Sequence, residues 1–150
     1  MRIIIQRVSE ASVTINGKVK GQIGTGLLLL AGFSASDTTE DLNWIARKVI
    51  QMRIFSDADD KLNLSLQDVS GDILLISQFT LFASTKKGNR PSYITAAPPA
   101  IAIPLYEKFI SILEAELGKP IQTGEFGTDM KVALINDGPV TISMDSQQKE

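Results

Sequence analysis

The sequence predicts a single α+β domain, because two amphipathic helical patterns are set among a larger number of strand-like segments. Of the 150 residues, 43% are hydrophobic and 21% are charged, which is the composition of an ordinary globular domain. A chain of this length can form a full hydrophobic core without disulfides or a structural metal. We therefore expect one domain over residues 1–150, with a frayed polar tail over residues 145–150.

The first elements are strands. Ile3, Ile4 and Ile5 form a β-branched run, and the Asn16-Gly17 pair separates two short strand-like runs, as in a two-residue β-hairpin turn. Residues 27–31, with the sequence LLLLA, are bounded by glycines and are short for a helix. They predict a buried strand.

Two helices follow. The first is predicted to begin at a capping box formed by Asp37 and Glu40, and its apolar face carries Leu42, Ile45, Val49 and Met52. The second spans residues 98–117 and ends at Gly118. The acidic stretch within residues 56–71 lacks the glycine and distal glutamate of a calcium loop, so a solvated turn is expected there.

The remaining elements are strands. One begins at residues 73–76 and is predicted to continue through residues 77–83, where polar residues enter an apolar run. Residues 130–135 and 140–144 alternate in polarity and predict two more strands, separated by residues 136–139. The strands outnumber the helices, which supports a strand-rich core.

Composition also limits the chemistry. The chain has no histidine and no cysteine, which excludes a Ser-His-Asp triad, a Cys-His pair and a typical zinc site. We expect no metal and no cofactor. The formal charge of −2 argues against strong non-specific nucleic-acid binding, so DNA is not an expected partner. The start of the chain resembles neither a signal peptide nor a membrane span, which predicts a cytoplasmic protein with no membrane partner.

Two segments carry polar or conformationally special residues where packing would favour apolar ones. Residues 77–83, SQFTLFA, and residues 136–141, NDGPVT, resemble two signatures of the D-aminoacyl-tRNA deacylase family, and the resemblance extends over roughly residues 1–144. It implies a homodimer of β-barrel-like subunits, each with two main helices, whose active sites lie at the subunit interface. The implied activity is hydrolysis of the ester between a D-amino acid and tRNA, and of mischarged glycyl-tRNA, in translational proofreading.

The resemblance also implies roles for these two segments. In the family, the peptide that corresponds to Gly138-Pro139 enters the partner's pocket in cis form, and its carbonyls crowd the substrate's α-carbon so that L-amino acids are rejected. Backbone N–H groups around Gln78 and Phe79 would bind the developing oxyanion. Thr80 would position the attacking water rather than attack as a nucleophile, because an alcohol needs a base that the segment lacks.

Further contacts are implied around the two segments. Arg7 would hold the Gly-Pro loop, and the tRNA would be met at its 3′-terminal adenosine and its acceptor-stem phosphates. Two alternatives stay open, namely a threonine-nucleophile hydrolase of another small ester and a non-catalytic tRNA-binding or editing module. A hairpin turn also explains residues 138–139, and a surface arginine explains Arg7. The other expected substrate contacts are Ser77, Phe126, Met130 and Asn136, and the expected phosphate contacts are Lys86, Lys87 and Arg90.

Overall fold

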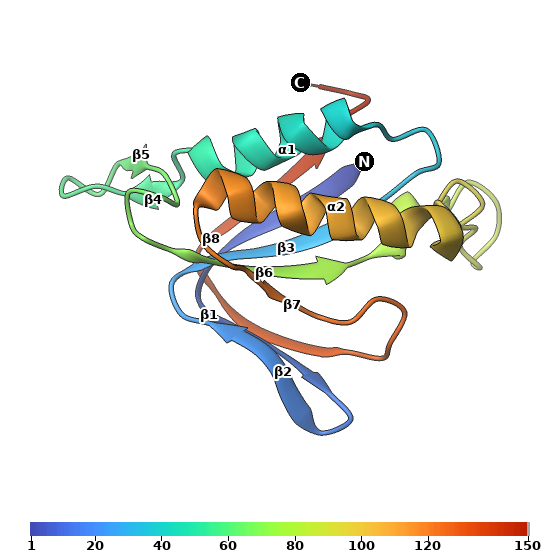
Figure 1. Ribbon diagram of the computed structural model, residues 1–150, viewed down its shortest axis with the longest axis horizontal. Coiled ribbons are helices and arrows are strands. Elements are labelled where there is room, and N and C mark those ends of the chain that lie inside the picture. Colours follow the sequence, from blue (N-terminus) through green and yellow to red (C-terminus); the bar gives the residue numbers. More distant parts are fainter. Residues whose placement is uncertain (150) are drawn as a thin grey trace.

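The computed structural model describes residues 1–149 as a curved sheet with two helices side by side on one face (Figure 1). This arrangement confirms the predicted α+β class and its two main helices. Along the chain the elements are β1 (Arg2–Ile15), β2 (Lys18–Ile23), β3 (Gly26–Gly32), α1 (Thr39–Gln51), β4 (Phe55–Ser56), β5 (Leu62–Leu64), β6 (Asp72–Ser77), the 3₁₀-helix η1 (Phe79–Phe82), α2 (Pro99–Leu117), β7 (Gln122–Thr123) and β8 (Lys131–Asp145).

The main sheet has the strand order β2-β1-β3-β6-β7, and β8 pairs with β1 on the side away from β3. Strand β1 is antiparallel to β2, β3 and β8, whereas β6 is parallel to β3 and β7. The sheet curls so that β2 and β7, the two ends of this strand order, come together. A Cβ atom built on Gly21 of β2 would lie only 3.3 Å from the Thr123 carbonyl oxygen of β7. The sheet is therefore a nearly closed barrel, as expected.

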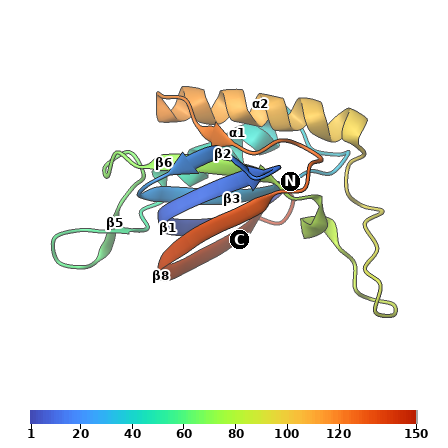
Figure 2. The ribbon, with the colours of Figure 1, turned by 90° about the horizontal axis from the view of Figure 1, so that it is seen from below.

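Two apolar layers fill the two faces of the sheet. The layer under the helices contains Ile5 of β1 and Phe109 of α2, and the layer inside the curl contains Val8 and Val13 of β1. Strand β1 serves both layers because register shifts between Gln6 and Glu10 interrupt the regular alternation of its side chains. Figure 2 shows β1 and β8 running side by side, with β8 on the side of the sheet away from α2.

The predicted hairpin is confirmed, because Asn16 and Gly17 have φ angles of 50° and 74° and join β1 to β2. The start of α1 differs from the prediction. The capping box pairs Thr38 with Asp41, not Asp37 with Glu40, and the Thr38 N–H donates to Asp41 Oδ2 at 2.8 Å. Asp37 instead accepts from the Ser34 N–H at 2.8 Å and from the α-ammonium of Met1. Both residue pairs have capping-box spacing, so the sequence did not distinguish them.

The end of the chain is also more ordered than predicted. Ser146 is 4% exposed, and its hydroxyl accepts a hydrogen bond from the α-ammonium of Met1. The Gln147 Nε2 donates to Asp41 Oδ1 at 3.0 Å, and the Lys149 ammonium lies 4.9 Å from the centre of the Trp44 ring. Residues 145–149 are thus anchored against the chain start and α1, and the prediction of fraying is wrong for them. Residue 150 lies outside the described part.

Within residues 1–149, no helix is long and apolar enough to cross a membrane.

Candidate active site

The SQFT segment leaves the sheet immediately after β6. The predicted strand over residues 77–83 is wrong, because β6 ends at Ser77 and residues 79–82 form η1. Gly32, at the end of β3, makes this turn possible, since a Cβ atom there would lie 2.8 Å from the Gln78 carbonyl oxygen. Arg2 fixes η1 from the other side by donating from Nη1 to the Leu81 carbonyl at 3.0 Å. Neither Gly32 nor Arg2 carries a signal in the sequence that marks it as a support of this turn.

The turn determines which N–H groups are available for a ligand. The Gln78 N–H donates to the Ala31 carbonyl at 2.7 Å, so it extends the pairing of β3 and β6 and is already occupied. Phe79 and Thr80 are the first two residues of η1, so no carbonyl within the helix can accept a hydrogen bond from their N–H groups. The backbone donors that remain for a substrate oxygen therefore belong to Phe79 and Thr80.

The Thr80 side chain is also held in place. The Gln78 side-chain amide donates to Thr80 Oγ1, which uses one acceptor position of the hydroxyl and leaves its proton to be donated elsewhere. Because Gln78 acts as a hydrogen-bond donor here, it does not serve as a base for Thr80. The geometry suits a hydroxyl that orients a bound molecule.

Phe126 and Met130 lie beside β6 on the segment that follows β7. The Gly124 N–H donates to the Leu75 carbonyl at 3.1 Å, and a Cβ atom on Gly124 would lie 2.4 Å from the Met130 sulfur, so glycine makes room for that side chain. Phe126 is half-buried and packs on the ring of Tyr106, with ring centres 5.9 Å apart. Burial raises the pKa of Tyr106 to about 12, which keeps this supporting phenol neutral.

The Gly-Pro segment is a bulge in β8 rather than a turn between two strands. Gln6 pairs with Thr141 and Val8 pairs with Asn136, so residues 137–140 bulge out opposite a single residue of β1. The hairpin interpretation is therefore wrong, and β8 is one strand where two were predicted. Asn136 closes the bulge, because its Oδ1 accepts from the Val140 N–H and its Nδ2 donates to Thr141 Oγ1, both at 2.9 Å.

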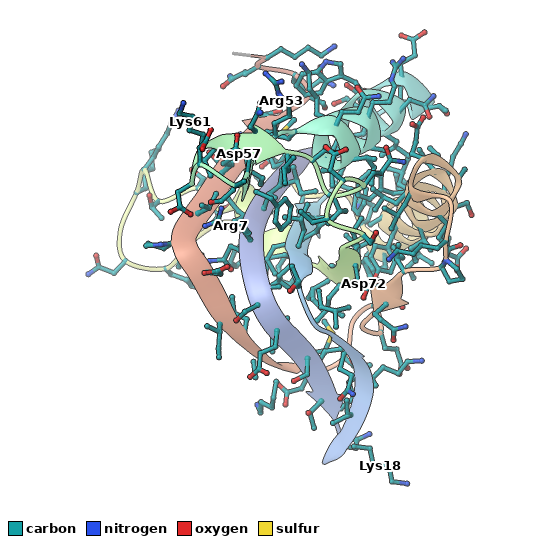
Figure 3. All side chains as sticks on the ribbon, turned by 90° about the vertical axis from the view of Figure 1, so that its left-hand side faces the viewer. Arg7, Lys18, Arg53, Asp57, Lys61 and Asp72 are labelled. Carbon is teal, nitrogen blue, oxygen red and sulfur yellow. The ribbon has the colours of Figure 1, made fainter. Side chains whose placement is uncertain are left out.

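Arg7 lies behind this bulge. It is 8% exposed, its Nε donates to the Asp137 carbonyl at 2.7 Å, and its Nη1 donates to the Ile54 carbonyl at 2.7 Å. Figure 3 shows Arg7 between the bent strands and the segment that carries Arg53 and Asp57. The Gly138–Pro139 peptide bond is cis, both residues are exposed, and Gly138 has a φ of 140°. Arg7 is thus a buried anchor rather than a surface residue, and the contact with Ile54 had no signal in the sequence.

The structure keeps the two signature segments apart within one chain. Strand register places Ser77 level with Ile3 of β1, whereas the Gly-Pro bulge lies opposite Arg7. Four residues correspond to about 13 Å along the strands, and the three strand spacings from β8 to β6 add about 14 Å across the sheet. Within one chain, the Gly138-Pro139 peptide therefore lies about 20 Å from the SQFT turn.

The predicted phosphate contacts lie on the loop between η1 and α2. Ser84 and Ser92 pair across its base with N–H to carbonyl distances of 2.7 and 3.0 Å, and Lys86, Lys87 and Arg90 lie exposed beyond this bridge. Elsewhere, the acidic stretch after β4 is a turn in which Asp57 accepts from the Asp59 and Lys61 N–H groups. Over residues 1–149 there is no group of three or more acidic side chains arranged to hold a metal ion.

Known proteins resemble this chain in sequence and in structure. The sequence profile of the D-Tyr-tRNA(Tyr) deacylase family matches residues 4–145. A D-aminoacyl-tRNA deacylase of Flavobacterium johnsoniae is 62% identical over 150 residues, which is 100% of both chains. A solved structure titled c-Myc DNA Unwinding Element Binding Protein has a TM-score of 0.89 at 39% identity, covering 97% of this chain and 98% of that one. A probable eukaryotic D-amino acid tRNA deacylase shares the fold, with a TM-score of 0.82 at 18% identity and coverage of 95% and 97%.

Proposed function

Because this chain belongs to the D-Tyr-tRNA(Tyr) deacylase family, we propose that it hydrolyses the ester of D-aminoacyl-tRNA and thereby removes D-amino acids from translation in the cytoplasm. The observation that carries the proposal is the turn after Ser77, where the first two N–H groups of η1 and the Thr80 hydroxyl, which accepts from the Gln78 side-chain amide, belong to adjacent residues. Backbone N–H groups and hydroxyls are among the catalytic groups that remain to a chain without histidine or cysteine, and residues 77–83 contain no carboxylate and no lysine.

The reaction begins with water attacking the ester carbonyl carbon. Negative charge then develops on the carbonyl oxygen, and the N–H groups of Phe79 and Thr80 stabilise it, each contributing about 3 kcal/mol in a site closed to solvent. The Thr80 hydroxyl orients the water or the ester. The bond between the carbonyl carbon and the ribose oxygen then breaks, and the proton released by the attacking water passes to that ribose oxygen, which gives the free D-amino acid and tRNA. An aminoacyl ester is reactive enough for orientation and charge stabilisation to provide most of the acceleration.

Selection between mirror-image substrates comes from the Gly138-Pro139 peptide of a second subunit. Asn136 and Arg7 hold the bulge rigidly, so its backbone acts as a wall against a side chain on the wrong side of the α-carbon. A D-amino acid directs its side chain away from this wall, and glycine has none. The same geometry therefore admits mischarged glycyl-tRNA and excludes L-aminoacyl-tRNA. Phe126, Met130 and Ser77 line the rest of the amino-acid pocket.

The proposed wall requires a homodimer. Since one chain keeps the two signature segments about 20 Å apart by strand geometry, the wall has to come from a partner related by twofold symmetry. Lys86, Lys87 and Arg90 then contact acceptor-stem phosphates, which makes binding sensitive to salt without reading sequence. The threonine-nucleophile alternative receives no support from Gln78, which donates to Thr80 instead of accepting its proton.

The experiment compares hydrolysis of D-tyrosyl-tRNA and L-tyrosyl-tRNA by the wild-type protein and two glycine variants. In Gly138→Ala, the new Cβ atom lies 2.9 Å from Arg7 Nη2 and 3.0 Å from the Val140 N atom, which displaces the wall. We expect kcat/KM for the D-ester to fall about a hundredfold and the D/L ratio to fall as well. Gly17→Ala is the matched control, because Gly17 also has a positive φ, of 74°, but has open space around it and lies in the turn between β1 and β2.

Three outcomes contradict the proposal. A wild-type protein that leaves D-tyrosyl-tRNA intact is not a deacylase. An unchanged D/L ratio in Gly138→Ala removes the wall from the mechanism. An acyl ester trapped on Thr80 in the wild-type protein establishes the covalent route in place of direct attack by water.

A further inference from the structure

The SQFT turn has little support from its own hydrogen bonds. Within η1 the Leu81 N–H donates to the Gln78 carbonyl at 3.2 Å. At its end the Ala83 N–H donates to the Thr80 carbonyl at 3.0 Å. These bonds do not fix a 3₁₀-helix of four residues in place, because 3₁₀ hydrogen bonds have poor geometry and a short helix is marginal alone. The position of η1 therefore depends on contacts from other elements.

Arg2 contacts η1 at two consecutive residues. Its Nη1 donates to the Leu81 carbonyl at 3.0 Å, and its guanidinium carbon lies 4.7 Å from the centre of the Phe82 ring. Phe82 is 8% exposed, so this ring is itself a fixed support for the cation. A hydrogen bond from a charged donor is stronger than one between neutral groups, and a planar guanidinium can form it while it lies over an aromatic ring. Arg2 is thus a strong external contact of the turn.

Arg2 is in turn held by the sheet and by Asp145. Strand register pairs Arg2 with Gly32 of β3 on one side and with Asp145 of β8 on the other. Its Nε donates to Asp145 Oδ2 at 2.9 Å. Burial opposes ionisation of Asp145, but hydrogen bonds from the Gln147 N–H and from Arg2, together with the charge of Arg2, hold the pKa of this carboxyl below its ordinary value. The guanidinium therefore links a charged strand end to the SQFT turn.

We propose that Arg2 is a positioning residue of the deacylase reaction, which holds the N–H groups of Phe79 and Thr80 where negative charge develops on the ester. This inference rests on the proposed function, because it concerns the same turn. Donors of this kind are effective when they are fixed before the reaction begins. Loss of Arg2 should therefore lower kcat and leave KM nearly unchanged. The donors act on the carbonyl that D- and L-esters share, so the D/L ratio should stay the same.

The kinetic test compares the wild-type protein with Arg2→Met and Arg2→Lys in the hydrolysis of D-tyrosyl-tRNA, under conditions where all are folded by circular dichroism. Methionine keeps an unbranched stem but cannot donate to the Leu81 carbonyl. We expect kcat of Arg2→Met to fall about 10- to 100-fold, which is less than the loss of a whole oxyanion donor, and KM to change less than about twofold. Arg2→Lys should lie between the two, because an ammonium keeps the charge but not the planar fork.

Arg47→Met is the matched control. Arg47 is an exposed residue of α1, outside the SQFT turn, and its replacement removes the same charge from the chain. Both kcat and KM of this variant should equal those of the wild type. A loss shared by Arg47→Met and Arg2→Met would come from net charge and would contradict the inference.

Hydrogen exchange provides a measurement that does not depend on the reaction. The Leu81 and Ala83 N–H groups are bonded within the turn, so their exchange rates report how often it opens. In Arg2→Met both should exchange about tenfold faster, because a charged hydrogen bond to the turn is lost. The Gly118 N–H, which donates to the Glu114 carbonyl at 2.8 Å at the end of α2, should exchange as in the wild type.

The inference is overturned if exchange at Leu81 and Ala83 is unchanged in Arg2→Met, or if its kcat is unchanged. It is also overturned if the loss appears as a higher KM or a lower D/L ratio, since Arg2 would then bind the substrate or support the wall. Failure of the proposed function gives a different result. In that case the wild-type protein leaves D-tyrosyl-tRNA intact, while faster exchange in Arg2→Met still shows that Arg2 fixes the turn.

Discussion

Replacing Arg7 by methionine tests whether the Gly-Pro bulge depends on one buried guanidinium. The substitution keeps an unbranched side chain of similar length but removes two hydrogen bonds of 2.7 Å, to the Asp137 and Ile54 carbonyls. Each bond from a charged donor contributes about 1.5–3 kcal/mol, and methionine avoids the cost of burying a charge. We therefore expect the free energy of unfolding to fall by about 3 kcal/mol.

The assay is urea denaturation at pH 7, followed in parallel with kcat/KM for D-tyrosyl-tRNA. With a typical slope of about 2 kcal/mol per molar urea, the midpoint of Arg7→Met should fall by about 1.5 M. Lys131→Met is the matched control, because it also removes one positive charge, but from an exposed pair with Asp129 whose side chains are 77% and 85% exposed. The control should change stability by less than about 0.5 kcal/mol and leave activity unchanged.

Two results would refute this reasoning. If Arg7→Met is no less stable than Lys131→Met, the two buried hydrogen bonds do not hold the bulge. If Arg7→Met is destabilised as expected but its D/L ratio is unchanged under conditions where it remains folded, the position of the bulge does not control selection.

Three further predictions concern the framework. Gly26→Ala should prevent folding, because the new Cβ atom would lie 2.0 Å from the Asp72 carbonyl oxygen, whereas Gly24→Ala, with nothing within 4 Å, should fold normally in circular dichroism. Thr38→Ala should lower the free energy of unfolding by about 1 kcal/mol through loss of the cap of α1. Burial raises the pKa of Tyr106 from 10.0 to about 12, so the fold favours the neutral phenol, and its stabilisation is complete below pH 10 and lost between pH 10 and 12. A stability profile of Tyr106→Phe that falls as steeply as the wild type over that range would contradict the assignment.

Local patterns were enough to predict much of this protein. The Asn16-Gly17 turn, the glycine-bounded strand at residues 27–31 and the apolar faces of both helices depend on residues close in the sequence, and all appear in the structure. The absence of histidine and cysteine limited the chemistry without reference to any fold. The two signature segments were sufficient to indicate the family that the comparisons show.

Features that depend on residues far apart in the chain were not predicted. Strand β6 ends at Ser77 because Gly32 leaves room for the Gln78 carbonyl, and β8 continues past its bulge because β1 pairs with both of its halves. The anchoring of Arg7 joins residues 130 positions apart, and the distance between the SQFT turn and the Gly-Pro bulge comes from the register of three strand pairings. Periodicity reports which side of an element is apolar, whereas these contacts depend on which elements become neighbours when the chain folds.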